Sequence, residues 1–568
     1  MSSIIKVDTI QDQSGNNIIN ESGNTITIGA SGDTINVVGT LQNNGSSVEV
    51  DSVTFKEGGT NFTNSLLVGT DSTGTLNSAD GNTGVGTGVF AALTSADNNV
   101  AVGLNALNAN TTGGNNVAIG KGSMLVNTVG LANVSVGDGN MGSNTEGECN
   151  TSVGQGALNA NTTGDSNVSL GRQSLKSNTT ASSNTAIGTF ALCANTTGAE
   201  NTAVGLCSLN ANTTGSSNVA IGRRALDANT EGSNNTAGGY NSLVFNTTGI
   251  DNTAFGSNAL QANTTANNNT AVGRFSLKSN TTGSDNTAVG HSALCSNTTG
   301  QYNVAVGCSP LLNNTEGTDN QAIGNKALCV NTTGSCNTAI GRLALRNNTT
   351  ANQNVALGQE SLCATTTGGS NLAVGVYAFK VRTTGELGVA VGNNAGCSNT
   401  TGNGNTFVGA SAGSNSTTGF QNHVFGVNAG TDAVKNITTE NHQIVIGNNG
   451  STHAFIKIAF TVTSDLRDKT NFNKVTHGLD FVNQLNPVSF QFKKSREDDT
   501  PTGDVRYGFK AQDILALEGD NPIIIDNHDP ENLKYKGEHL VPVLVNAIKE
   551  LSETNKDLKS RIEALESN

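Results

Sequence analysis

Short runs of alternating apolar and polar residues fill the first part of the chain. Thr25-Ile-Thr-Ile-Gly29 and Thr34-Ile-Asn-Val-Val-Gly39 are examples, and clusters of Gly, Asn and Ser separate such runs. Alternation with a period of two is typical of β-strands, and the intervening residues are typical of turns. The pattern predicts an N-terminal β segment over residues 1–81.

From Asn82 to about residue 430 the apolar and polar positions repeat every 17 residues. Glycine occupies the fifth position in all 21 copies, from Gly86 to Gly426. The copy that starts at Asn201 reads Asn-Thr-Ala-Val-Gly-Leu-Cys-Ser-Leu-Asn-Ala-Asn-Thr-Thr-Gly-Ser-Ser. An unbroken short period indicates that each repeat is one coil of a solenoid. The predicted fold class is therefore mostly β, with a parallel β-solenoid of 17-residue coils over residues 82–430.

The positions of the repeat suit such a coil. Positions two to five predict a short strand, with Val204 at position four pointing to one face and alanine and glycine to the other. Leu209 at position nine adds a second apolar point for the interior. Positions 12 to 15, Asn-Thr-Thr-Gly, predict a turn in which Asn and Gly tolerate left-handed angles. Asn at positions one and twelve is expected to stack into amide ladders.

The face of alanine and glycine is predicted to be an assembly surface. A strand face that carries almost no side chain fills a core poorly, but it suits the close approach of another backbone. We therefore expect the small face of each coil to pack against other copies of the chain around a shared axis.

The last coils depart from the pattern. Position nine changes from Leu to Gly396, Gly413 and Gly430, and bulkier apolar runs follow between His442 and Phe460. We expect a cap and neck over residues 431–463.

Charge divides the chain at Ser464. Residues 464–568 contain 14 Lys+Arg and 19 Asp+Glu, whereas the whole chain has only 30 and 44. The net charge of −14 and the absence of a basic stripe argue against a nucleic-acid partner. No signal peptide and no apolar run of membrane-spanning length appear, so we expect synthesis in a cytoplasm and no membrane insertion. The nine cysteines are scattered without metal-ligand spacing, so no metal and no cofactor is expected.

A heptad pattern marks the end of the chain, at about residues 538–567. Apolar residues and one asparagine recur in steps of four and three, which predicts the seam of a coiled coil. The seam consists of Leu544, Ile548, Leu551, Asn555, Leu558, Ile562 and Leu565. An amphipathic helix that packs on its own domain is the alternative.

The hexad Ser464-Asp-Leu-Arg-Asp-Lys469 contains the one candidate for covalent chemistry. Ser464 and Lys469 have the residue types of a serine–lysine dyad, in which a neutral lysine activates the serine hydroxyl. Arg467 is a candidate for the positive charge that lowers a lysine pKa, whereas Asp465 has to face away or pair with Arg467. The hexad alone is more typical of a solvated turn than of a catalytic dyad.

Two resemblances extend this reading. The repeats resemble the head repeats of YadA-like trimeric adhesins and the Asn-Thr-Ala-Ile-Gly repeats of phage fibres, which implies a trimer. Residues 463–568 resemble the intramolecular chaperone domain of phage endosialidases, the S74 peptidase family. The segments that carry this second resemblance are Leu479–Phe492, Tyr507–Asp513, Pro522–Asp526 and the terminal helix.

The S74 resemblance implies a small α+β domain over residues 464–568 that trimerises, assists folding of the fibre and then cuts itself off. The implied cut lies between Thr463 and Ser464, with Ser464 as nucleophile and Lys469 as its partner. Such self-cleavage in a single turnover is the only enzyme activity expected here.

The expected function is that of a phage virion structural protein, a tail or side fibre. Its expected partners are two further copies of the chain, other virion proteins, and a host-surface receptor such as a glycan or outer-membrane component. Virion attachment is one candidate role for residues 1–81. The alternatives are a fibre-borne polysaccharide depolymerase and a bacterial trimeric adhesin.

Overall fold

The computed structural model describes most of the repeats and most of the C-terminal region. The described residues are 9–11, 17–22, 25–28, 48–50, 53–57, 61–69, 73–432, 434–451, 454–455, 457, 464–493 and 496–567. The chain divides into two compact units, Met1–Asn234 and Asn235–Asn568, and each is described by itself.

Short strands precede the repeats, as the alternating pattern predicts. Three of them form an antiparallel sheet and three others pair before the first repeat, while β6 and β8 pair with one another. The strands are β1 (Thr9–Gln11), β2 (Asn17–Ser22), β3 (Thr25–Ile28), β4 (Val48–Val50), β5 (Val53–Glu57), β6 (Phe62–Thr63), β7 (Leu66–Gly69) and β8 (Ala79–Asp80).

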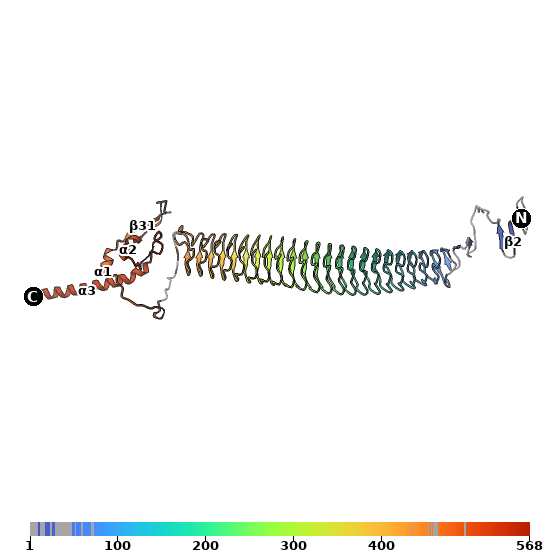
Figure 1. Cartoon of the computed structure of the whole chain (residues 1–568), viewed down its shortest axis with the longest axis horizontal. Coiled ribbons are helices and arrows are strands. Elements are labelled where there is room, and N and C mark those ends of the chain that lie inside the picture. The colour runs from blue at the N-terminus through green and yellow to red at the C-terminus, as the bar shows by residue number, and fades with distance from the viewer. Residues whose placement is uncertain are drawn as a thin grey trace. The chain divides into compact units, whose positions relative to one another are not determined.

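In the first unit, parallel three- or four-residue strands follow one another every 17 residues (Figure 1). Stacking begins one coil before the predicted start at Asn82, because β7 already pairs in parallel with β9. The strands are β9 (Thr83–Gly86), β10 (Val100–Val102), β11 (Val117–Ile119), β12 (Val134–Val136), β13 (Thr151–Val153), β14 (Val168–Leu170), β15 (Thr185–Ile187), β16 (Thr202–Val204) and β17 (Val219–Ile221).

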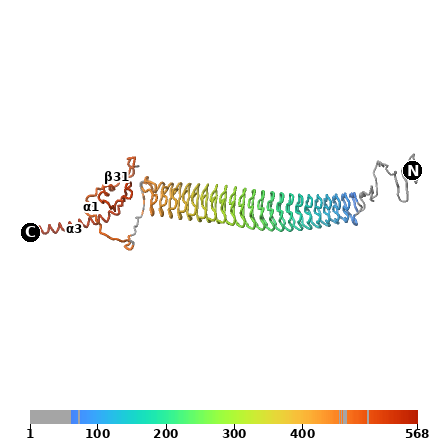
Figure 2. Tube along the Cα trace, in the orientation of Figure 1, coloured from blue at the N-terminus to red at the C-terminus, as the bar shows by residue number. Residues whose placement is uncertain are grey.

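The second unit continues the same coil design, so that the described part of the chain has about 22 turns (Figure 2). Its coil strands are β18 (Thr236–Gly238), β19 (Thr253–Phe255), β20 (Thr270–Val272), β21 (Thr287–Val289), β22 (Val304–Val306), β23 (Gln321–Ile323), β24 (Thr338–Ile340), β25 (Val355–Leu357), β26 (Leu372–Val374), β27 (Val389–Val391), β28 (Thr406–Val408), β29 (His423–Phe425) and β30 (Ile444–Ile446). The predicted parallel β-solenoid of 17-residue coils is confirmed.

Buried asparagines hold neighbouring coils in register. At position one, the amide nitrogen of Asn99 donates to Oδ1 of Asn82 over 3.0 Å, and at position twelve Asn127 donates to Asn110 over 2.9 Å. Both amide ladders were predicted, and both lie inside the coil, where each hydrogen bond satisfies a group that water cannot reach.

The core of each coil contains alanine from position three and leucine from position nine. Ala203 and Leu209, for example, have no exposed surface. The prediction that the alanine face contacts other chains is therefore wrong. The interior of a 17-residue coil is narrow, so that a large side chain at position nine leaves room only for a small one at position three.

The opposite face of each strand is the exposed one. Position four carries valine or isoleucine in most coils, and Ile119 and Ile221 remain 40% and 50% exposed. Position two, which points to the same side, is half-buried in most coils. Each unit thus presents an apolar sheet face, which we call the outer strand face and define as positions two and four of the coils.

Left-handed backbone occurs at other positions than predicted. Leu209 at position nine has φ 49° and Glu200 at position seventeen has φ 60°, whereas the asparagine at position twelve and the glycine at position fifteen are not left-handed. The chain turns mainly at positions five, seven, nine and seventeen. Burial of the leucine offsets the strain of a left-handed conformation.

The last coils rebuild the core around aromatic rings. Gly396 and Gly413 replace the leucine at position nine, and a Cβ at either would lie 2.5 Å from the ring of Phe407. Phe407 stands at position three, where other coils have alanine. In these coils the large side chain of the core therefore comes from position three instead of position nine.

The C-terminal region is a small α+β domain, as predicted. Its helices pack around a small hydrophobic core that includes the start of strand β33. The core residues are Phe481, Ile514, Ile524, Ile525, Leu540 and Val543. The elements are η1 (Leu466–Asp468), α1 (Leu479–Gln484), β31 (Val488–Lys493), β32 (Pro501–Gly508), α2 (Ala511–Glu518), β33 (Ile525–Asp526), β34 (Lys534–Tyr535), η2 (Gly537–His539) and α3 (Leu540–Glu566).

Two glutamate carboxylates stabilise this domain by accepting hydrogen bonds from backbone amides. Glu550 of α3 accepts a hydrogen bond of 2.6 Å from the backbone N–H of Leu479 and so caps the start of α1. Glu518 accepts from three successive amides, Ile523 to Ile525, at 2.7–2.9 Å. Among the described helices, none is long and apolar enough to cross a membrane.

Candidate functional site

Ser464 and Lys469 lie together at the start of the C-terminal region. Lys469 Nζ donates a hydrogen bond to Ser464 Oγ, and both residues are exposed. The one-turn helix η1 lies between them, so that the chain reverses and brings residues five apart into contact. The structure thus shows a direct side-chain contact between Ser464 and Lys469.

Asp465 organises this turn. Its carboxylate accepts from the backbone N–H of Arg467 over 2.8 Å and thereby caps the N-terminus of η1. The same carboxylate pairs with the Arg467 guanidinium, Nη2 to Oδ2, over 2.6 Å. This side-chain pairing, together with the backbone hydrogen bond, lowers the pKa of Asp465 below its ordinary value.

The carboxylate of Asp465 thus pairs with Arg467, which is one of the two arrangements expected for it from the sequence. Thr463 lies outside the described residues, so that the scissile bond assigned to Thr463 and Ser464 stays a prediction, as do the catalytic roles.

The outer strand face is a second candidate site, and sequence reasoning assigned it wrongly. Valine or isoleucine stands at position four in 16 of the 21 repeats, so that each unit exposes a row of apolar side chains. Large exposed apolar surfaces are typical of protein–protein interfaces. The sequence did contain an indication of this apolar strand face, since β-branched residues dominate both position two and position four.

At one coil of the outer strand face, a large side chain packs over a glycine of the neighbouring coil. Position four is glycine at Gly238, and the ring of Phe255 from the next coil lies over it, 2.5 Å from where a Cβ would be. The larger ring thus lies along the surface rather than standing out from it.

Helix α3 presents a third candidate surface. Leu540, Val543 and Ala547 are buried against the rest of the domain, which corresponds to the alternative of a helix that packs on its own domain. The predicted seam, in contrast, stays largely exposed, and Ile548 is 65% and Leu565 76% exposed. The helix therefore packs through one face and leaves its heptad face open.

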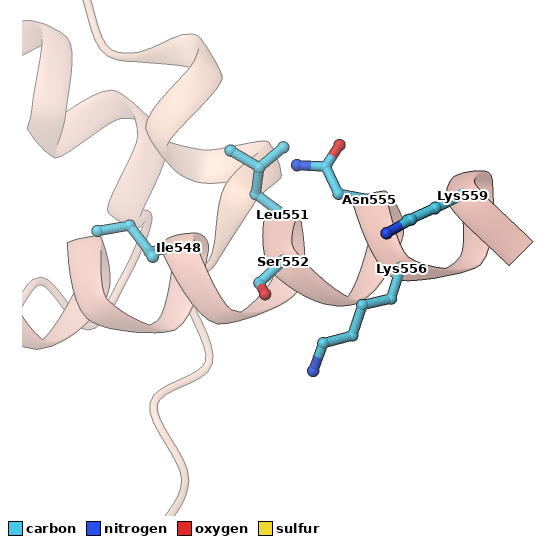
Figure 3. A pocket seen from close by; sticks show the side chains of 6 residues that line it. All are labelled: Ile548, Leu551, Ser552, Asn555, Lys556 and Lys559. Atoms are coloured by element: carbon cyan, nitrogen blue, oxygen red, sulfur yellow. The ribbon is translucent and has the colours of Figure 1, made fainter.

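Part of this seam lines a shallow depression on α3. Figure 3 shows Leu551 and Asn555 projecting to the same side of the helix. The residues that line the depression are Ile548, Leu551, Ser552, Asn555, Lys556 and Lys559. Uncovered apolar residues with a single asparagine between them are typical of a coiled-coil position without its partner helix.

Comparison with known families identifies the C-terminal region. Residues 464–520 match the family model described as the chaperone of endosialidase, Peptidase S74. The match begins at Ser464 itself and ends just after α2. No curated protein and no solved structure matches the chain. The predicted resemblance of this region to the S74 family is confirmed.

Proposed function

We propose that this chain, which ends in a region similar to the chaperone of endosialidase, is a subunit of a trimeric phage tail or side fibre. Two surfaces support assembly from several copies: the outer strand face and the exposed seam of α3. The chaperone region brings three chains together through α3, and the coils then fold with their outer strand faces toward a shared axis. Attachment to the host surface is the role of the finished fibre.

We further propose that the chaperone region removes itself by cutting between Thr463 and Ser464. The observation that carries this is the contact of Lys469 Nζ with Ser464 Oγ at the first residue of the family match. A neutral Lys469 takes the hydroxyl proton while Ser464 Oγ attacks the carbonyl carbon of Thr463. The peptide C–N bond breaks as the Thr463–Ser464 ester forms, and the proton passes to the new α-amino group.

Water completes the reaction. It attacks the ester, releases the carboxylate of Thr463 and restores the Ser464 hydroxyl. A lysine serves as base only where its charged form is disfavoured, for which burial is the usual means. Since the dyad is exposed in the single chain, we propose that assembly with neighbouring chains provides this burial, so that cleavage follows trimerisation.

Substitution of the nucleophile tests the cleavage. The parent chain is expected to give two bands on a denaturing gel, with the shorter fragment beginning at Ser464 by N-terminal sequencing. Ser464→Ala is expected to give one full-length band, because alanine has no nucleophile. Ser489→Ala, at an exposed serine of β31, is the matched control and should be cut like the parent. A parent chain that stays uncut, or a Ser464→Ala chain that is cut, contradicts the proposal.

Lys469→Arg separates a base from a mere hydrogen-bond donor. Arginine retains the charge and can still donate to Ser464, but it does not lose its proton in proteins. The Lys469→Arg chain is therefore expected to remain uncut, whereas cleavage at the parent rate would show that the lysine acts only as a donor.

A further inference from the structure

The charges of the repeats are separated onto two sides of the coil. Between residues 82 and 430, every lysine and arginine except the buried Arg382 stands at position six, seven or ten. All aspartates and glutamates there, except Asp138, Asp227 and Glu360, stand at position fourteen, sixteen or seventeen. These side chains are exposed or half-buried. We call the two sets the basic edge and the acidic edge.

The two edges lie on opposite sides of the outer strand face. Arg274 of the basic edge follows strand β20, whereas Asp285 of the acidic edge precedes strand β21. Six residue steps along the strand lead from position seventeen to position six, a span of roughly 20 Å. A single chain therefore cannot pair its own position-six cations with its own position-seventeen anions across the strand. Ion pairs described on the coils, Arg224–Asp227 at 2.7 Å and Lys380–Glu360 at 3.1 Å, lie within the basic edge.

The basic residues are also spaced along the edge. Five of them stand at position six. In the first unit Lys121, Arg172 and Arg223 are each three coils apart, and in the second unit Arg274 and Arg342 are four coils apart. Three coils of stacking correspond to roughly 14 Å. Since this exceeds the Debye length of about 10 Å at moderate salt, like charges at position six repel only weakly. A partner charge in direct contact would be attracted far more strongly.

Symmetry decides what each edge meets when outer strand faces turn toward one another. In a parallel arrangement around a common axis, the right flank of one chain meets the left flank of the next, because the interface is heterologous. Basic edge then faces acidic edge at every contact. In an antiparallel face-to-face pair, basic edge would face basic edge.

We infer that the basic edge of each chain docks on the acidic edge of a neighbouring copy of the same chain, and that this pairing selects the parallel arrangement. The inference rests on the proposed trimer and adds its interface and its direction. The apolar outer strand face holds the copies together, while the charged edges exclude the antiparallel pairing through repulsion.

The charges also carry register information. Four of the five basic residues at position six, all except Arg342, have an acidic residue at position sixteen or seventeen no more than one repeat away. The acidic residues concerned are Glu148, Asp165, Glu200, Asp251 and Asp285. Neighbouring chains at the same height therefore bring opposite charges close together.

Reversal of the two edges, singly and together, tests the inference in the full chain. One variant changes Arg172, Arg223 and Arg274 to Glu, a second changes Glu200, Asp251 and Asp285 to Lys, and a third combines all six changes. The readout is the temperature at which half of the assembled species on an unboiled denaturing gel becomes monomer. Each triple variant is expected to lower this temperature by several degrees, and the sixfold variant to restore it.

Restoration is the informative outcome, because the two edges of one chain are too far apart to compensate one another. A sixfold variant no more stable than the weaker triple variant, or triple variants as stable as the parent, would overturn the inference while leaving the trimer intact. A parent chain that is monomeric throughout would overturn the proposed trimer as well. Retention of the assembled parent on immobilised heparin at low salt would show that the basic edge is free, and would also overturn the inference.

Discussion

At the scale of single residues, the buried Arg382 shows how a local exception is accommodated. It stands at position twelve, where most coils have a ladder asparagine, and its Nε and Nη2 donate to the carbonyl oxygens of Gly385 and Glu386 at 3.0 and 2.9 Å. Burial lowers its pKa to about 10, which leaves the guanidinium charged at neutral pH. The guanidinium also lies 4.4 Å from the ring of Phe379.

The neighbouring coil provides the space for this arginine. Position one is glycine at Gly388 and asparagine in all the remaining repeats. A Cβ at Gly388 would lie 2.9 Å from the guanidinium carbon of Arg382. The asparagine ladder of position twelve ends at Asn348, two coils before Arg382. The next coil has Thr365 at this position, and Oδ1 of Asn348 has no hydrogen-bond partner among the described residues. Arg382 and Gly388 thus act as a pair.

Gly388→Asn, which restores the common residue of the repeat, is therefore expected to destabilise the coils. We expect a loss of several kcal/mol, because a buried charge would be displaced from its carbonyl partners. The double variant Arg382→Asn/Gly388→Asn should recover most of this loss, since two asparagines fit the ladders. Thermal unfolding of the parent, both single variants and the double variant measures the coupling, and additive effects would contradict the pairing.

At the scale of elements, the loop between β29 and β30 closes the last coil through one carboxylate. Glu440 accepts hydrogen bonds from Lys435 Nζ over 2.8 Å and from the Thr438 amide over 2.7 Å. Burial alone would raise the pKa of Glu440, but these hydrogen bonds outweigh it and hold the pKa at about 2. The loop is thus stabilised by the ionised form.

The direction of the pH dependence follows from this lowered pKa. Glu440 stabilises the loop fully above its ordinary pKa of 4.5, and the contribution is lost as the pH falls toward 2. Because the side chain is partly exposed, we expect an effect on the order of 1 kcal/mol. Hydrogen exchange of residues 434–442, corrected for intrinsic rates, should show severalfold lower protection at pH 2.5 than at pH 6. Glu440→Gln is the control and should lack this change. Equal pH dependence in both chains would contradict the assignment.

The elements also show how far the sequence could predict the fold. The 17-residue period predicts coils, ladders and the leucine core because every coil repeats the same contacts with its neighbours. The strand face that points into the coil was predicted wrongly, because alternation defines two faces without indicating which of them is inside. Burial of Ala203 and exposure of Ile221 decide that question. The left-handed leucine was not predictable from propensity, since only packing makes that conformation favourable.

The candidate dyad illustrates the opposite case. The hexad alone is typical of a solvated turn, and its chemistry was predicted from a resemblance. The structure adds the contact of Lys469 with Ser464 and the separate pairing of Asp465 with Arg467. Burial of the dyad in the proposed fibre would depend on neighbouring chains, and a single sequence does not specify their positions.

At the scale of the whole molecule, the exposed surfaces are consistent with a chain made to associate. The outer strand face is apolar along the coils of both units, and α3 leaves its seam open beyond the part that packs on its own domain. A monomer would expose both surfaces to water, where extended apolar patches favour aggregation. The proposed association of three copies would cover them and place the charged edges in contact.

The mass of the assembled particle tests this account most directly. The Ser464→Ala chain, expected to remain uncut, should be measured by native mass spectrometry so that chaperone and coils stay in one polypeptide. The account predicts a species of three times the 57.8 kDa chain mass. A stable, folded species with the mass of a single chain would contradict it.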